Sequence, residues 1–155
     1  MKKMGEPNIH ELFMVQIMRT SEIVQHRIAV VLKDYELTPP QYNILRILRG
    51  AEGDLSVGEI KKRMLFETSD VSRLLDRLVK KGLANRNICP NNRRKMDVCI
   101  SKIGVQVLDK LYGELAQTLN GFYEEALSKE KAQEIMEVLQ RIVASEPKVL
   151  ENQNN

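Results

Sequence analysis

Short polar side chains are followed by arginines at helical spacing in the stretch 68–81. The set is Thr68, Ser69, Asp70, Ser72, Arg73 and Arg77. In a helix over residues 69–81 this set lies opposite an apolar stripe, which is made by Val71, Leu74, Leu75, Leu78 and Val79. Small polar groups at a helix N-terminus can approach the major groove of DNA, and arginine can donate two hydrogen bonds to guanine. An amphipathic helix with a merely solvated polar face fits the pattern equally well.

A second basic cluster follows in a predicted turn. Residues 90–95 read Pro-Asn-Asn-Arg-Arg-Lys, and the flanking segments 83–89 and 95–101 predict two strands of a β-hairpin. A narrow hairpin with arginine at its tip fits the minor groove, where the negative potential is strong. We therefore assign Asn92, Arg93, Arg94 and Lys95 to DNA contact, with a solubilising turn as the alternative.

Basic residues are concentrated in the middle of the chain. Residues 56–97 carry eleven Lys and Arg against five Asp and Glu, whereas the whole 155-residue chain carries 24 against 21. The middle is thus net +6 and the remainder net −3. A basic segment between acidic flanks favours a polyanionic partner for that segment alone, although a solvated basic surface is equally compatible with the charge.

The elements that would position these residues are mostly helical. Apolar spacings of three and four, together with capping residues, predict helices over residues 8–34, 38–50, 56–63, 69–81, 102–127 and 128–146. Ser56 and Glu59 form a capping box, and Gly82 follows two lysines as a helix C-cap. We also assign Ser56 to DNA contact. Three compact helices followed by a two-stranded wing give the element order of a winged helix-turn-helix.

We therefore predict a mainly α fold with a small β-wing, in one domain. Residues 36–101 would form the winged helix-turn-helix DNA-binding lobe, and residues 8–34 and 102–146 a helical dimerisation layer. The lobe is too small to cover the outer helices, so their apolar stripes would otherwise remain exposed. A second copy of the chain is the expected cover, which predicts a homodimer.

Several stretches resemble the MarR family of transcription regulators. They are Leu37-Thr-Pro-Pro-Gln-Tyr-Asn-Ile-Leu, Leu55-Ser-Val-Gly-Glu-Ile, Val71-Ser-Arg-Leu-Leu-Asp-Arg-Leu-Val-Lys-Lys-Gly-Leu, Asn92-Arg-Arg and Ile100-Ser-Lys-Ile-Gly. The last is similar to the Leu-Thr-x-x-Gly segment that ends the family's wing, with Ser101 in place of Thr. The resemblance covers residues 37–104 by motif and the outer helices by layout.

The resemblance implies a dimer that binds a pseudo-palindromic double-stranded DNA operator. Each helix 69–81 would enter a major groove, and repression relieved by a small-molecule effector would be the usual outcome, although the sequence identifies no effector. The family's wing usually reads Asp-x-Arg, in which the Asp orients the Arg. Here Asn92 replaces that Asp and Arg94 is retained, so a weaker neutral acceptor supports the arginine.

The two cysteines and two histidines offer weaker signals. Cys89 and Cys99 fall on opposite strands of the predicted wing, which allows a cross-strand redox switch, but two small strand residues are the favoured interpretation. Peroxide-sensing members of the family carry their reactive cysteine in the first helix, and residues 1–34 contain none. His10 and His26 are expected to be solvated or to lie at the core edge, and they make a poor metal site.

Other classes of function lack a signature. We find no nucleophile–base pair, paired carboxylates, metal cluster or glycine-rich phosphate loop, so we predict no enzymatic activity, no cofactor and no metal. The apolar runs are far shorter than the about 20 residues of a membrane span, and no signal peptide is visible, which predicts a cytoplasmic protein. The alternative function is a winged-helix protein-interaction module without specific DNA binding.

Overall fold

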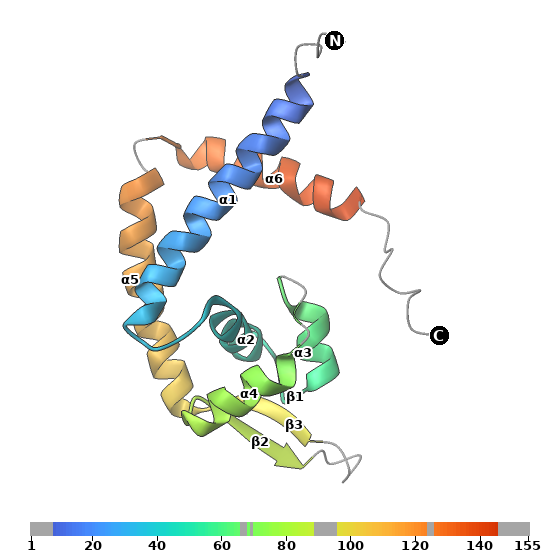
Figure 1. Ribbon diagram of the computed structural model, residues 1–155, viewed down its shortest axis with the longest axis vertical. Coiled ribbons are helices and arrows are strands. Elements are labelled where there is room, and N and C mark those ends of the chain that lie inside the picture. The colour runs from blue at the N-terminus through green and yellow to red at the C-terminus, as the bar shows by residue number, and fades with distance from the viewer. Residues whose placement is uncertain (1–7, 66–67, 69, 89–95, 124–125, 146–155) are drawn as a thin grey trace, which may run out of the picture. The chain divides into compact units, whose positions relative to one another are not determined.

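The computed structural model describes residues 8–65, 68, 70–88, 96–123 and 126–145. The chain divides into two compact units, residues 1–115 and 116–155. Helices dominate both units, and a small antiparallel sheet lies in the N-terminal one, which confirms the predicted fold class (Figure 1). The division into a DNA-binding lobe and a dimerisation layer stays a prediction. Among the described helices, none is long and apolar enough to cross a membrane.

The N-terminal unit holds most of the elements. In chain order they are α1 (Ile9–Lys33), α2 (Pro39–Arg49), β1 (Leu55–Ser56), α3 (Val57–Arg63), α4 (Val71–Lys80), β2 (Ala84–Ile88), β3 (Met96–Ile100) and the first part of α5 (Lys102–Tyr123). Helix α5 continues into the C-terminal unit, which also contains α6 (Lys129–Ser145). Figure 1 shows α2, α3 and α4 grouped against the sheet, as in a winged helix-turn-helix.

The helix starts follow the predicted caps. The Asn8 side chain accepts from the amide of His10 at 2.6 Å, and Glu11 accepts in return from the amide of Asn8 at 3.2 Å, so α1 begins with a capping box. Helix α4 begins at Val71, two residues later than predicted, because Asp70 has φ −108° and ψ 33°, outside the helical region. Gly82 has φ 71°, which only glycine adopts without strain, and this ends α4 as predicted.

The sheet has three strands, one more than the sequence predicted. Strand β3 is central, with β1 on one side and β2 on the other, and both pairings are antiparallel. Ala84 faces Ile100 at one end of the β2–β3 pair, and Leu55 faces Val98 in the β1–β3 pair. Strand β1 is only two residues long, too short to show the period of two by which a strand is recognised.

The core of the N-terminal unit joins all its helices to the central strand. Its fully buried side chains are Leu32, Ile44, Leu45, Ile60, Leu75, Leu78, Val98, Leu108 and Leu111. Helix α5 therefore packs against the lobe through Leu108 and Leu111, whereas only Leu32 is buried in the 25 residues of α1. Leu75 and Leu78 of α4 belong to this core, so the helix is packed against the rest of the unit along one side.

Candidate nucleic-acid interface

Helix α4 separates an apolar side from a polar side. Val71, Leu75 and Leu78 are buried in the core, at spacings of four and three. The exposed residues of the helix fall on the opposite side and are Ser72, Arg73, Asp76, Arg77 and Lys80. Three of these five carry positive charge. The predicted geometry of the base-reading helix is therefore present: its apolar stripe is fixed, and its basic side is open to a partner.

The start of α4 places Asp70 beside Arg73. Asp70 occupies the N-cap position, but within the described residues its side chain makes no capping hydrogen bond. It lies 3.8 Å from the guanidinium of Arg73, whose side chain is 78% exposed. A solvent-exposed ion pair at this distance contributes little free energy, so Arg73 can exchange Asp70 for a DNA base or phosphate at small cost.

An ion pair joins α4 to the first strand of the wing. Asp76 pairs with Arg86 of β2, and the Arg86 side chain is only 32% exposed. The pair neutralises the one other acidic residue on the polar side of α4, and it fixes the side of the helix against the sheet. Sequence reasoning missed Arg86 in this role, because the two residues are ten apart and meet only when β2 folds back along α4.

Hydrogen bonds of Ser101 connect the end of α4 to the start of α5. The Ser101 hydroxyl donates to the carbonyl of Gly82 at 2.6 Å and accepts from the amide of Gly104 at 2.9 Å. The Ser101 amide donates to the carbonyl of Leu83 at 3.0 Å. Ser101 thus caps α5 while holding the residue that ends α4, which gives the segment Ile100-Ser-Lys-Ile-Gly a physical role as the joint between these helices.

Ser56 is the N-cap of α3, as predicted. Its hydroxyl accepts from the amide of Glu59 at 3.3 Å and donates to the Glu59 carboxylate at 2.6 Å. The bond from the hydroxyl, followed by one from the Ser56 amide to the same carboxylate at 2.9 Å, lowers the pKa of Glu59 below its ordinary value. Because the hydroxyl is engaged within the helix, a contact between Ser56 and a DNA phosphate would have to replace the bond to Glu59. That contact stays a prediction.

The predicted site residues are thus placed in part. Asp70, Ser72, Arg73 and Arg77 share the exposed side of α4, and Thr68 is half-buried just before it. Ser69 and the four wing-tip residues lie outside the described residues, namely Asn92, Arg93, Arg94 and Lys95. The structure therefore assembles the part of the site that belongs to α4, and the contribution of the wing tip rests on sequence alone.

The register of the β2–β3 pair rules out the alternative in which Cys89 is the cross-strand neighbour of Cys99. Asn85 lies opposite Cys99 on β2, whereas Cys89 follows the end of that strand and lies outside the described residues. Burial raises the pKa of the Cys99 thiol, and the carboxylate of Asp54 raises it further. Both effects disfavour the reactive thiolate, so a redox role for Cys99 loses support.

The two histidines lie exposed on α1. His26 borders a shallow depression that also involves Glu22, Arg27 and Pro39, all within the N-terminal unit. Among the residues that the structure describes, no three His, Cys, Asp or Glu side chains gather in a way that would hold a metal ion.

Comparisons with known proteins agree with this architecture. Residues 35–95 match the profile of the MarR family. The chain is 26% identical over 110 residues to an uncharacterized HTH-type transcriptional regulator, YsmB of Bacillus subtilis (strain 168), a match that covers 71% of this chain and 75% of YsmB.

Two solved structures are similar in fold. Sco3205, a MarR family transcriptional regulator from Streptomyces coelicolor in complex with DNA, is 20% identical with a TM-score of 0.78, and the match covers 96% of this chain and 95% of Sco3205. BpsR of Bordetella bronchiseptica, whose DNA binding is regulated by 6-hydroxynicotinic acid, is 19% identical with a TM-score of 0.77, and the match covers 92% of this chain and all of BpsR.

Proposed function

The chain belongs to the MarR family of winged-helix transcription regulators, and on that premise we propose that it is a homodimer that binds a specific double-stranded DNA operator. The proposal includes repression that a small-molecule effector relieves, and a cytoplasmic location, where such an operator would be found. The operator would be pseudo-palindromic, because a two-fold symmetric dimer presents two equivalent helices to the duplex.

The exposed basic side of α4 carries this proposal. Arg73 and Arg77 lie one helical turn apart, with Ser72 beside them, on a helix whose other side is locked into the core. A helix held in this way can insert its N-terminal half into the major groove, where Arg73 would read a base edge. Lys80, on the last turn, would lie nearer the phosphate backbone. The wing-tip residues assigned from the sequence, above all Arg94, complete the proposed contact surface.

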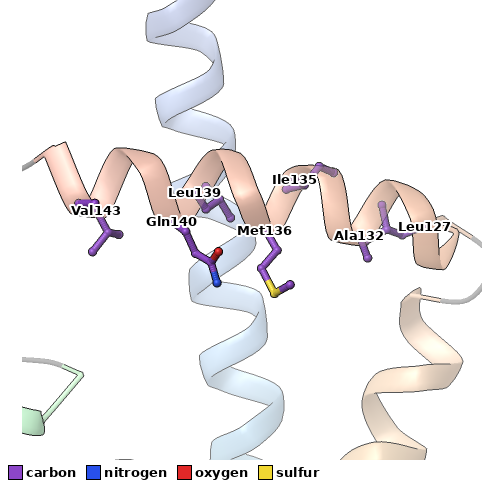
Figure 2. Close-up of a pocket in the computed structure, with 8 residues that line it drawn as sticks. Leu127, Ala132, Ile135, Met136, Leu139, Gln140 and Val143 are labelled. Carbon is purple, nitrogen blue, oxygen red and sulfur yellow. The ribbon is translucent and has the colours of Figure 1, made fainter.

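The outer helices support dimerisation. Helix α6 has no buried residue, and an open apolar groove runs along it within the C-terminal unit. Its lining residues, drawn as sticks in Figure 2, are Leu127, Ala132, Ile135, Met136, Leu139, Gln140, Val143 and Ala144. Helix α1 also exposes large apolar side chains, among them Leu12, Phe13 and Met18. Apolar stripes of this length are covered by a partner in stable proteins, and a second copy of the chain is the proposed partner.

Effector control rests on similarity. The DNA binding of BpsR responds to 6-hydroxynicotinic acid, and the two chains share a fold at 19% identity. This supports a small molecule as the class of effector and does not extend to its identity. The depression beside His26 is the first place to search for it within the N-terminal unit.

The decisive experiment is selection of DNA by the purified protein. Genome fragments captured by the protein would be sequenced, and gel shifts on enriched and scrambled duplexes would follow across a salt series. We expect a short pseudo-palindrome to be enriched, with affinity falling steeply as salt rises. Folded dimer that enriches nothing over random duplex would reject the proposal and favour a protein-interaction module instead.

Two variants separate base reading from general attraction. Arg73→Ala should relax the base preference at one operator position, at a cost of about 1–3 kcal/mol for the preferred base. Arg94→Ala should weaken binding to all duplexes more uniformly. If Arg73→Ala keeps the wild-type sequence preference on mutated operators, Arg73 does not read a base.

Sedimentation tests the dimer. The wild-type protein should sediment at twice the 17.8 kDa mass of the chain, and Val143→Glu should shift it toward the monomer, because a charge placed in the groove cannot be buried against a second copy. Gln133→Glu is the matched control: it adds the same charge to α6 at an exposed position that does not line the groove. A wild-type protein that stays monomeric at all concentrations would reject this part of the proposal.

A further inference from the structure

The side chain of Asn43 is a buried amide on α2, outside the helix that carries the proposed DNA surface. Among the described residues, the buried polar side chains are Gln41, Asn43 and Ser101, and Asn43 is 9% exposed. Its neighbours on the helix, Tyr42 and Ile44, are buried and belong to the hydrophobic core. An amide in such surroundings costs free energy unless its polar atoms are hydrogen-bonded, so its partner shows what the residue does.

The partner is the backbone that leads into α4. The Oδ1 atom of Asn43 accepts from the amide of Leu65 at 2.9 Å. Helix α3 has ended by then, since Met64 is extended with φ −63° and ψ 139°, and the Leu65 side chain is 66% exposed. The Leu65 side chain therefore does little to fix this point of the chain, and the hydrogen bond from its backbone does so instead.

The start of α4 lies six residues beyond this anchor. Asp70 gives α4 no side-chain cap, as described above, and the first buried residue of the helix is Val71. The end of α4 is held differently, by the bond from Ser101 to Gly82 and by the Asp76–Arg86 pair. The buried Val71 and Leu75 hold the N-terminal half of α4, which carries Arg73, to the core, and the anchor at Leu65 adds a fixed point on the chain before the helix.

We propose that Asn43 is a positioning residue for specific DNA binding, because its hydrogen bond to the Leu65 amide sets the approach of the chain to the base-reading end of α4. The inference rests on the proposed function. A bidentate contact between arginine and a base tolerates little displacement, whereas long basic side chains follow a phosphate through small shifts. Loss of the anchor therefore reduces the preference for operator over random duplex and leaves binding to random duplex nearly unchanged.

The test compares four variants with the wild type. Asn43→Leu keeps the number and branching of the side-chain heavy atoms and removes the acceptor, and Asn43→Asp keeps an acceptor oxygen in place. Ile44→Val trims a buried neighbour on α2 without touching the anchor, and Arg73→Ala removes the proposed base contact itself. The readouts are the affinity ratio of operator to scrambled duplex in gel shifts, and the exchange rate of the Leu65 amide measured by NMR.

Asn43→Leu should lower the affinity ratio about tenfold, the discrimination of one displaced base contact, and should speed exchange at Leu65. Asn43→Asp should restore most of both. Ile44→Val should change neither, although it lowers stability, and Arg73→Ala should lower the ratio without affecting exchange. If Asn43→Leu does not fold, Asn43→Ala takes its place with the same expectations.

Three other outcomes decide against the inference or its premise. An unchanged affinity ratio in Asn43→Leu, in protein whose Leu65 amide exchanges faster, would overturn the inference while the proposed function stands. An unchanged Leu65 exchange rate would also overturn it, since the anchor would then not hold this segment. A wild-type protein that does not distinguish operator from scrambled duplex would reject the proposed function, and the exchange data would still report on the anchor.

Discussion

Gly104→Ala is expected to destabilise the protein, although Gly→Ala within a helix ordinarily stabilises. Gly104 lies in the first turn of α5, where this helix passes close to the backbone of Leu83. A Cβ at this position would fall far inside van der Waals distance of the Leu83 carbonyl oxygen, 3.1 Å from the carbonyl carbon and 2.9 Å from Cγ1 of Ile100. The oxygen and the carbonyl carbon belong to the backbone and cannot turn aside as a long side chain would.

The loss of stability in Gly104→Ala follows from the displacement that the added Cβ forces on α5. Relieving the clash pushes the start of α5 away from Leu83, which stretches the bond from the Ser101 amide to Leu83 and the bond from Gly104 to the Ser101 hydroxyl. Overpacking costs about 1–3 kcal/mol, and two lost hydrogen bonds cost about 1 kcal/mol each. Replacing glycine in a helix returns at most about 1 kcal/mol. The free energy of unfolding should therefore fall by about 2–4 kcal/mol.

Urea unfolding followed by far-UV circular dichroism measures this change, at one fixed protein concentration because an oligomer's stability depends on concentration. Gly113→Ala is the control: Gly113 is exposed on the same helix, and a Cβ there would meet nothing within 4 Å. It should raise stability by about 0.5–1 kcal/mol. Equal stabilities for the two variants would refute the close approach of α5 to Leu83.

Three further outcomes are expected. Lys80→Ala should weaken specific and random duplexes alike and reduce the slope of log affinity against log salt by about 1, as gel shifts across a salt series would report; a selective loss on the operator would instead make Lys80 a base contact. A double-mutant cycle on Asp76→Ala and Arg86→Ala, measured by urea unfolding, should give a coupling free energy of about 0.5–1 kcal/mol for this partly exposed pair. A coupling free energy of zero would mean that the ion pair does not hold α4 to β2. Burial and the Asp54 carboxylate raise the pKa of Cys99, so its thiolate forms at higher pH than that of free cysteine. The rate of its alkylation, followed by peptide mass spectrometry, should therefore rise with a pH midpoint above that of free cysteine, and Asp54→Asn should lower this midpoint. A pH midpoint at or below that of free cysteine would contradict the assigned environment.

The supports of α4 come from outside the helix. Arg86 of β2 pairs with Asp76, Ser101 holds Gly82 at the joint, and Asn43 holds the chain before the helix. Under the proposed function, specific binding by this helix depends on residues outside it. Substitution of the uncharged Asn43 should alter sequence preference without altering the charge of the surface.

Local rules were sufficient for the order of the helices and the hairpin and for the exposed side of α4. Asn8 and Ser56 cap their helices as predicted, Gly82 ends α4, and the spacing of Val71, Leu75 and Leu78 identified which side is buried. These features depend on residues three or four apart, whose relation is fixed by the helix itself. The sequence therefore predicts the basic side of α4, because it lies opposite the apolar stripe.

Pairings between distant segments needed the tertiary structure. Strand β1 exists only because Leu55 and Ser56 lie beside β3, the register that places Asn85 and not Cys89 opposite Cys99 is set across the hairpin, and the bond from Leu65 to Asn43 spans 22 positions. A side-chain period of two cannot show which residues face each other, and an Asn within an apolar run does not show which backbone amide it serves. The sequence by itself determined which residues form α4 and which side of the helix is free, because neighbours along the chain fix local geometry. Only the tertiary structure decided what holds that helix in place, because contacts between distant segments fix the position of one element against another.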